Sequence, residues 1–544
     1  MLPWFGDRTE KLGHPMSSVA EARKLLAELP IADPLKALEE LSSWLNSITG
    51  TAGFSAKLRI NLTLLLDETG QPFHEALLKK YLAAPRLQDF QGVHLWDAMR
   101  MFNRELVRAY EASLAACPRG SLIAVPLRRM PPILSARLLR AAAQHMKLEL
   151  MRYLDVSGAT WEWMFRCYSA AEAGHFASTV LTAYPADAIA TSPQRELLRA
   201  LMLYESSPGN LAPDQIEVAF RITARVSGVF DLTITPDAGS EFCIDLAQPH
   251  APKTLDGAIV ANPTMRYFSA LGALPAIAGI IDQHARGRSR EERRFGDEFT
   301  PLGKLTVLKH LQVYWDKDHP HRRTARRGIS STIEVAHSFR VISKLVPHFD
   351  LSSAAGLTEH EAAALAARSK FSLAPAGEGG YRSEAWTVVD ASPAGIGGTI
   401  PEGAGAWVKI GSLCGVKAVN ADMWWVGVIR RLHSRPRDVA QVGIELLGKR
   451  SLAVWLRLLG QGAERMPSWA TSSGSFRYSY FPAILLPDAQ NSYMDATMLL
   501  ESGSYAEGKI YEALLGENNQ NVELTALLAE GEDYELVKFR WLTA

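Results

Sequence analysis

The chain lacks the features that mark several protein classes. Its four cysteines are scattered without a CxxC pair, so neither a disulfide framework nor a thiolate zinc site is expected. Lys plus Arg equals Asp plus Glu, 58 each, so no net field draws the protein to nucleic acid or to an anionic membrane. The longest apolar runs, such as 271–281, are too short to cross a bilayer. With no secretory pattern at the N-terminus, we expect a cytoplasmic protein.

The amino-acid composition and the length are typical of an ordinary globular protein with several domains. Hydrophobic residues make up 47% of the 544 positions and charged residues 21%. Residues 1–225 place apolar side chains three and four positions apart, with start signals at Ser18 and Asp33. This domain is therefore expected to be a helical array, with helices over 19–29, 35–45, 76–82, 98–115, 135–153, 161–184 and 193–204.

The remainder of the chain changes character twice. Residues 226–316 predict a mixed region, with a β-hairpin over 230–246 and helices over 265–281 and 305–314. From 317 to 460, short strands at 329–335, 386–390, 407–410, 423–429 and 441–446 favour a small β-barrel with a helical insertion in 351–373 and a helical tail over 448–459. Residues 470–544 predict a C-terminal β-rich module. The fold class expected is thus a multidomain α+β protein.

A dense group of arginines precedes the first barrel strand. Guanidinium groups match phosphate oxygens two at a time, and their planes stack on purines. Taken alone, such a basic run is more commonly a solvated linker. The candidate ligand residues in it are Arg322, Arg323, Arg326 and Arg327.

A second group follows the apolar strand that ends near residue 389. The carboxylate of Asp390 can accept two parallel hydrogen bonds from the N1 and N2 edge of guanine, which adenine cannot offer. Ser392 adds a hydroxyl, and Gly395 allows a left-handed backbone or the close approach of a ligand. A plain β-turn with an Asx cap would use the same residue types.

Arg-Arg-x-x-x-Arg before a strand and Asp-x-Ser-x-x-Gly after a later one together resemble the PilZ domain, a bacterial receptor module for cyclic di-GMP. The resemblance covers at most residues 318–460 and implies a six-stranded barrel. It implies that the arginines bind the phosphates and stack on guanine, and that the acidic residue and the serine read the guanine. In one register, Arg323 and Arg327 are the two arginines of the motif that lie four positions apart. A shift by one residue puts Arg322 and Arg326 at these positions. The insertion between the motifs departs from the family pattern.

The function expected is that of a cyclic di-GMP effector whose helical N-terminal domain binds a protein partner. The resemblance implies control of motility, surface attachment or exopolysaccharide. An interaction scaffold with a degenerate barrel that binds no nucleotide is the alternative. We expect no enzyme, metal or further cofactor: residues 503–510 approach a phosphate-binding loop but have Ile510 where Ser or Thr must stand, and are expected to form a β-turn.

Overall fold

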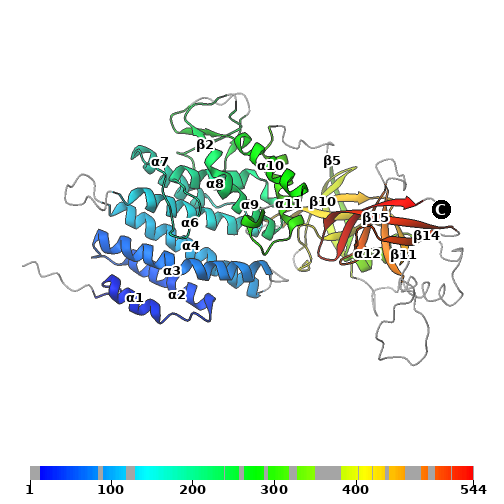
Figure 1. Cartoon of the computed structure of the whole chain (residues 1–544), viewed down its shortest axis with the longest axis horizontal. Coiled ribbons are helices and arrows are strands. Elements are labelled where there is room, and N and C mark those ends of the chain that lie inside the picture. Colours follow the sequence, from blue (N-terminus) through cyan, green and yellow to red (C-terminus); the bar gives the residue numbers. More distant parts are fainter. Residues whose placement is uncertain are drawn as a thin grey trace, which may run out of the picture. The chain divides into compact units, whose positions relative to one another are not determined.

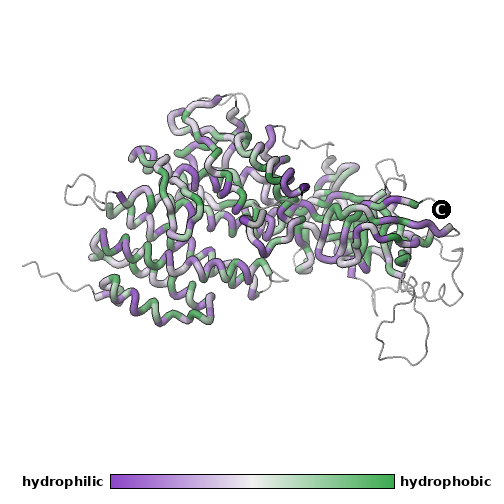
Figure 2. Tube along the Cα trace, in the orientation of Figure 1, coloured by the Kyte–Doolittle hydropathy of each residue, from purple (hydrophilic) through white to green (hydrophobic). Residues whose placement is uncertain are grey.

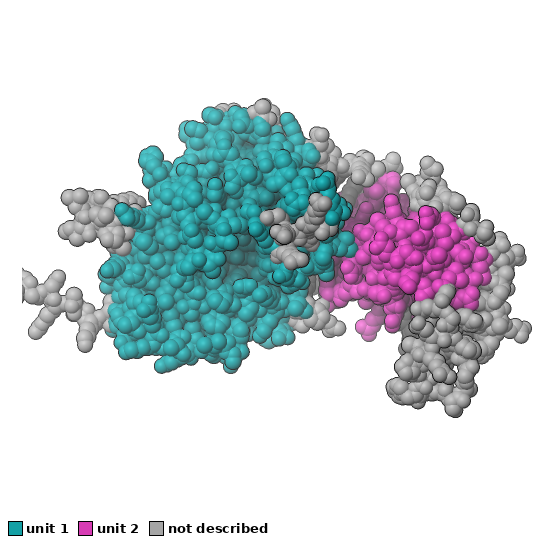
Figure 3. Space-filling view, in the orientation of Figure 1, with its two compact units in different colours: residues 1–321 teal, residues 322–544 magenta. Residues whose placement is uncertain are grey.

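The computed structural model consists of two compact units, residues 1–321 and 322–544, which Figure 3 colours separately. No helix among the described residues is both long and apolar enough to cross a membrane. The structure describes residues 13–83, 90–117, 129–237, 239–255, 262–286, 292–317, 327–348, 382–401, 404–419, 421–434, 440–459, 480–487, 496–515 and 518–542.

The first unit is mainly helical, as predicted. The Ser18 hydroxyl accepts a hydrogen bond from the amide of Glu21, and Asp33 caps the next helix in the same way, so both predicted start signals are confirmed. The longer helices are α1 (Val19–Ala27), α2 (Pro34–Gly50), α3 (Ala56–Ala83), α4 (Phe90–Ala115), α6 (Pro131–Met151), α7 (Gly158–Ala173), α8 (Pro193–Glu205), α9 (Pro213–Val226), α10 (Leu274–Ala285) and α11 (Pro301–Tyr314) (Figure 1).

These helices pack around one apolar core. Helix α4 contacts α2, α3 and α6, and α6 in turn contacts α7, α8 and α9. Most helices have an apolar side and a polar side, visible as alternating green and purple along the tube in Figure 2. Leu41, Phe102 and Leu138 are among the fully buried side chains of this core. Burial of these apolar sides, more than helix propensity, stabilises the array.

The mixed region differs from the sequence prediction in two places. A four-stranded sheet has the order β1 (Leu232–Thr233), β4 (Met265–Phe268), β2 (Phe242–Asp245) and β3 (Lys253–Thr254). The predicted hairpin over 230–246 is wrong, because β4 lies between its two strands. The helix predicted from 265 begins with this strand instead, since pairing on both sides outweighs its helical spacing. In the helical region, the helix predicted over 161–184 is wrong at its C-terminal end, because α7 ends at Ala173, where Phe176 folds back against Gly174.

The second unit begins with the predicted six-stranded barrel. The strands are β5 (Arg327–His337), β6 (Glu384–Ser392), β7 (Gly395–Thr399), β8 (Leu413–Ala418), β9 (Trp425–His433) and β10 (Gln441–Gly448), closed in the order β10-β7-β6-β5-β8-β9. The strand predicted at 407–410 is wrong, because a turn occupies it and β8 follows. The glycine-rich β7 was not predicted. The insertion predicted in 351–373 lies outside the described residues.

A second closed barrel follows directly. Its strands are β11 (Leu452–Leu458), β12 (Phe481–Leu486), β13 (Thr497–Glu501), β14 (Ile510–Leu515), β15 (Asn518–Glu530) and β16 (Tyr534–Leu542), in the order β11-β12-β13-β16-β15-β14. The helical tail predicted over 448–459 is therefore wrong, because β11 pairs with β12 and β14 there. The β-rich character predicted for the C-terminus is confirmed.

Helix α12 (Phe339–Leu345) joins the two barrels through one apolar cluster. Phe339 and Ile342 are fully buried in it, together with Val428 of the first barrel and Ile484 of the second. The backbone N–H of Phe339 also donates to Asp533 Oδ2 at 2.6 Å. Burial raises the pKa of this Asp533 carboxyl. The two barrels are therefore joined by one shared apolar cluster.

Candidate ligand site on the first barrel

The predicted arginine group directly precedes the first barrel strand in the sequence. Arg322, Arg323 and Arg326 lie outside the described residues. The backbone of Arg327 begins β5, which is the first strand, as predicted. The boundary between the two compact units falls between residues 321 and 322, at the beginning of this group.

The second predicted group lies beside that strand start. Strands β5 and β6 are antiparallel, and their register pairs Arg327 with Ala391 and Gly328 with Asp390. Directly paired residues have Cα atoms about 4.5–5.5 Å apart. The family resemblance predicts that the two segments share one site. In the structure, the backbone of Arg327 runs alongside Asp390.

A β-bulge sets the direction of Asp390. Val388 pairs with Gly398 of β7, whereas Asp390 pairs with Gly397, so Val389 is an extra residue in β6. Simple alternation would put Asp390 on the core face with Trp386 and Val388. The bulge changes this phase and turns Asp390 to the outer face, and bulges commonly re-aim side chains in this way next to functional sites. Asp390 is accordingly half-buried, and Val389 is 53% exposed.

A two-residue turn holds the rest of the motif together. Ser392 pairs with Gly395 across Pro393 and Ala394, and its hydroxyl donates to the carbonyl oxygen of Gly395 at 3.3 Å. Gly395 does not have a left-handed backbone. A Cβ atom there would lie 2.7 Å from the carbonyl oxygen of Ile444, so the close approach that requires glycine is to strand β10.

Strand pairing extends the outer surface beyond the predicted residues. Gly397 pairs with Gly443 of β10, and Gly443 pairs with Arg431 of β9. Neither sequence motif predicts this row. The glycine spacing of β7 together with Gly443 is a signal of it in the sequence, since glycines are unusual within strands.

The other outer side of the same barrel is covered. Leu413 of β8 pairs with Val428 of β9, and both belong to the apolar cluster around α12 and the second barrel. Both side chains are almost completely buried although they point away from the centre of their own barrel. The predicted motif lies on a different part of the barrel, the outer face of β6, β7 and β10.

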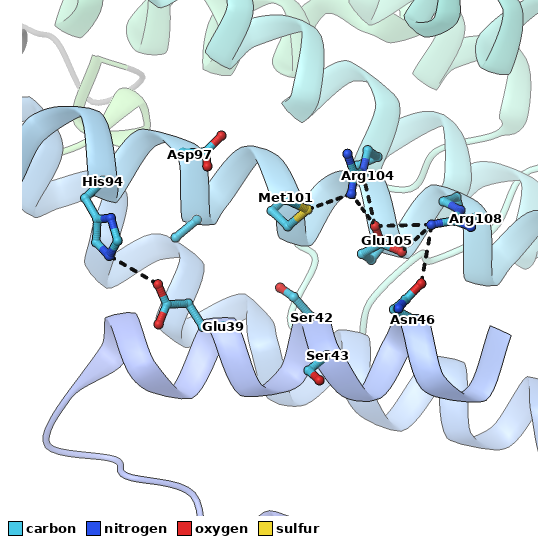
Figure 4. Close-up of a pocket in the computed structure, with 11 residues that line it drawn as sticks. Glu39, Ser42, Ser43, Asn46, His94, Asp97, Met101, Arg104, Glu105 and Arg108 are labelled. Carbon is cyan, nitrogen blue, oxygen red and sulfur yellow. Dashed lines mark hydrogen bonds and ion pairs between the residues drawn. The ribbon is translucent and has the colours of Figure 1, made fainter. Parts of the chain in front are cut away.

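The helical unit contains a polar groove of about 330 Å³ between α2 and α4. Figure 4 shows His94 pointing to Glu39, with Nε2 3.3 Å from Oε1. Arg104 and Arg108 both approach Glu105, at 2.9 and 3.1 Å. The opposite charges of this groove thus satisfy one another, and they do not select a ligand of either charge.

A larger cavity of about 660 Å³ lies among α3, α6, α8 and residues 184–191. Its charged floor is also internally paired: Arg140 contacts Asp187 at 2.7 Å and Glu196 at 2.6 Å. The hydroxyl of Tyr184 donates to Asp67 Oδ2 at 2.9 Å and fixes the 184–191 segment. Burial raises the pKa of the Asp67 carboxyl. These contacts are explained by the packing of the loop.

Residues 503–510 form turns between β13 and β14, as expected. Gly503 has φ +80°, and three successive backbone amides, of Gly503, Ser504 and Tyr505, donate to the carboxylate of Glu535 at 2.7–3.1 Å. Such converging amides can bind an anion. Here a side chain of the same barrel takes that place, so the loop is a structural turn.

Comparison with known proteins agrees with the resemblance of the barrel. Residues 20–237 match a family model described as the N-terminal domain of the cyclic-di-GMP receptor FimW, and residues 343–452 match one described as its middle PilZ domain. The second match contains Asp390, Ser392 and Gly395, and it ends at the first residue of β11. No curated protein matches the chain. The two matches together place the chain in the family of cyclic-di-GMP receptors with a FimW-type N-terminal domain and a middle PilZ domain.

Proposed function

We propose that the chain is a cytoplasmic effector that binds cyclic di-GMP on the outer face of its first barrel. The observation that carries this proposal is the register of β5 and β6, in which the segment that follows the arginines runs directly alongside Asp390. A doubly charged cyclic dinucleotide offers phosphates to guanidinium groups and a guanine edge to a carboxylate. The proposed contacts are Arg323 and Arg327, or Arg322 and Arg326, with Asp390 and Ser392.

We further propose that binding is transmitted to the helical unit. The arginine group begins where the second compact unit begins, so a ligand that holds these arginines restrains the connection between the units. The connection between the units then has a free state and a restrained state, and the ligand shifts the equilibrium between them only by its different affinity for the two. The helical domain would then present a surface to a protein partner in a ligand-dependent way.

Calorimetric titration of the full chain with cyclic di-GMP tests the first proposal. We expect binding by the wild type, and a strong loss when Arg323 and Arg327 are both changed to Ala. Asp390→Ala should cost about 1–3 kcal/mol of binding free energy, as for the loss of a charged hydrogen-bond partner. Cyclic di-AMP is the matched ligand control, because adenine lacks the paired donors that a carboxylate reads.

The alternative is a scaffold that binds no nucleotide. Thermal unfolding of the same full chain, with and without ligand, distinguishes the two. Saturating ligand should raise the thermal midpoint of a binder, whereas a scaffold would show neither heat nor stabilisation. Limited proteolysis between residues 318 and 326 tests transmission separately. Ligand should protect this segment, and cleavage at an unchanged rate under saturation would contradict the proposed coupling.

A further inference from the structure

An uninterrupted row of paired residues crosses the outer face of the first barrel. It runs from Asp390 on β6 through Gly397 on β7 and Gly443 on β10 to Arg431 on β9. Directly paired residues share a face of the sheet. Their neighbours Ile396 and Ile444 are buried in the core, so the row itself points outward. Three strand spacings of about 4.8 Å separate its ends by roughly 14 Å.

The middle of this row has no side chains. Gly397 and Gly443 form its floor, and in the next row Gly395 lies between Ser392 and Glu445. A Cβ atom at Gly443 would lie 3.1 Å from Cβ of Arg431. This stretch of the outer face therefore carries no side chains of its own and its glycines are buried, while polar side chains stand at its two edges.

A second bulge places two arginines together at the far edge. Ile429 pairs with Ile444 and Arg431 with Gly443, so Arg430 is an extra residue in β9. Both arginines are consequently exposed. Arg430 Nε donates to Glu445 Oε2 at 2.7 Å, whereas Arg431 has no ion-pair partner among the described residues. One of the two guanidinium groups is thus paired within the protein, and the other has no such pair in the described part of the chain.

We propose that Arg431 is a further ligand contact, which binds a phosphate of the cyclic dinucleotide at the β9 end of this row, across the glycines from Asp390. A purine read by Asp390 and Ser392 lies on the glycine floor, and the phosphodiester next to it reaches the Arg431 guanidinium. Such a group binds phosphate oxygens through two parallel hydrogen bonds. The inference rests on the proposed function, and it adds a contact from a strand that neither sequence motif includes.

Titration of the full chain with cyclic di-GMP tests this contact. Arg431→Ala should weaken binding about ten- to a hundredfold, as for the loss of a charged hydrogen-bond partner. Arg431→Lys should recover part of the affinity, because it keeps the charge and loses the planar fork. Gly443→Ala should weaken binding with Arg431 still present, because its methyl group stands on the floor. Arg540→Ala is the control, since Arg540 is an exposed arginine of the second barrel that pairs with Glu523.

The outcomes separate this inference from the proposed function. If the wild type does not bind, the proposed function itself is refuted. If the wild type binds, Asp390→Ala weakens binding and Arg431→Ala does not, only the role of Arg431 is refuted. A smaller dependence of affinity on salt in Arg431→Ala than in Arg540→Ala would support a direct phosphate contact. Circular dichroism should show both variants folded, because both side chains are exposed.

Discussion

The two barrels of the second unit have one connectivity and two different surfaces. In both, the first strand pairs with the second and fourth, and the third pairs with the second and sixth. The second and third strands of the first barrel are joined by the two-residue turn Pro393 and Ala394, whereas the same connection in the second barrel runs from 487 to 496. The predicted motif lies on that short turn. A closed barrel of this order is thus a scaffold, and the site depends on its turn and bulges.

The barrels also differ in how they use converging polar groups. In the second barrel the carboxylate of Glu535 occupies the backbone amides of the β13–β14 turn. In the first barrel a bulge turns Asp390 outward beside a glycine floor. The turn of the second barrel is thus filled by its own side chain. The shared cluster around α12 packs this barrel against the first.

Breaking the shared cluster should have the largest effect on stability. Ile342→Ala removes a fully buried side chain at the centre of that cluster and should cost about 2–5 kcal/mol. Because both barrels contribute to the cluster, hydrogen exchange should increase in β8 and β9 and also in β12 and β13. Val419→Ala, at a 57% exposed position, is the control and should change little. Faster exchange in only one barrel would show that the two are independent.

Removing the internal carboxylate should affect the second barrel alone. Glu535→Ala leaves three backbone amides without their acceptor and should lower the free energy of unfolding by about 1–3 kcal/mol. Thermal unfolding measures this loss. The affinity for cyclic di-GMP should stay unchanged, since Glu535 lies in the barrel without the motif. A marked change in affinity would mean that the second barrel takes part in binding.

Loosening the short turn should affect the site more than the fold. Pro393→Gly gives the unfolded chain more freedom and should cost about 0.4–1 kcal/mol of stability. It also frees the hairpin that holds Ser392 beside Gly395, so ligand affinity should fall several-fold. Pro401→Gly, which lies beyond the other end of β7, is a matched control for the loss of proline. If calorimetry gave the two variants equal affinity for cyclic di-GMP, the 393–394 turn would have no role in ligand binding.

The sequence predicted the class of each region better than its pairing. Apolar spacing and caps located α1 and α2, and two motifs placed Asp390 near Arg327, because these signals are local. The pairing of β4 between β1 and β2 depends on contacts far apart in the chain, which spacing does not report. The same holds for β11, whose apolar pattern is compatible with a helix until β12 and β14 flank it. Bulges are invisible to alternation, so the outward direction of Asp390 could not be predicted.

The ion pair between the barrels should matter least. Lys409 Nζ lies 3.0 Å from Glu532 Oε2, and the side chain of Glu532 is 68% exposed. Water and salt screen such a pair, and fixing two long side chains costs entropy, so Lys409→Ala should change stability by under about 1 kcal/mol. Chemical denaturation at low and high salt measures this, and the small difference should disappear at high salt. An effect as large as that of Ile342→Ala would mean that charge, and not the apolar cluster around α12, holds the two barrels together.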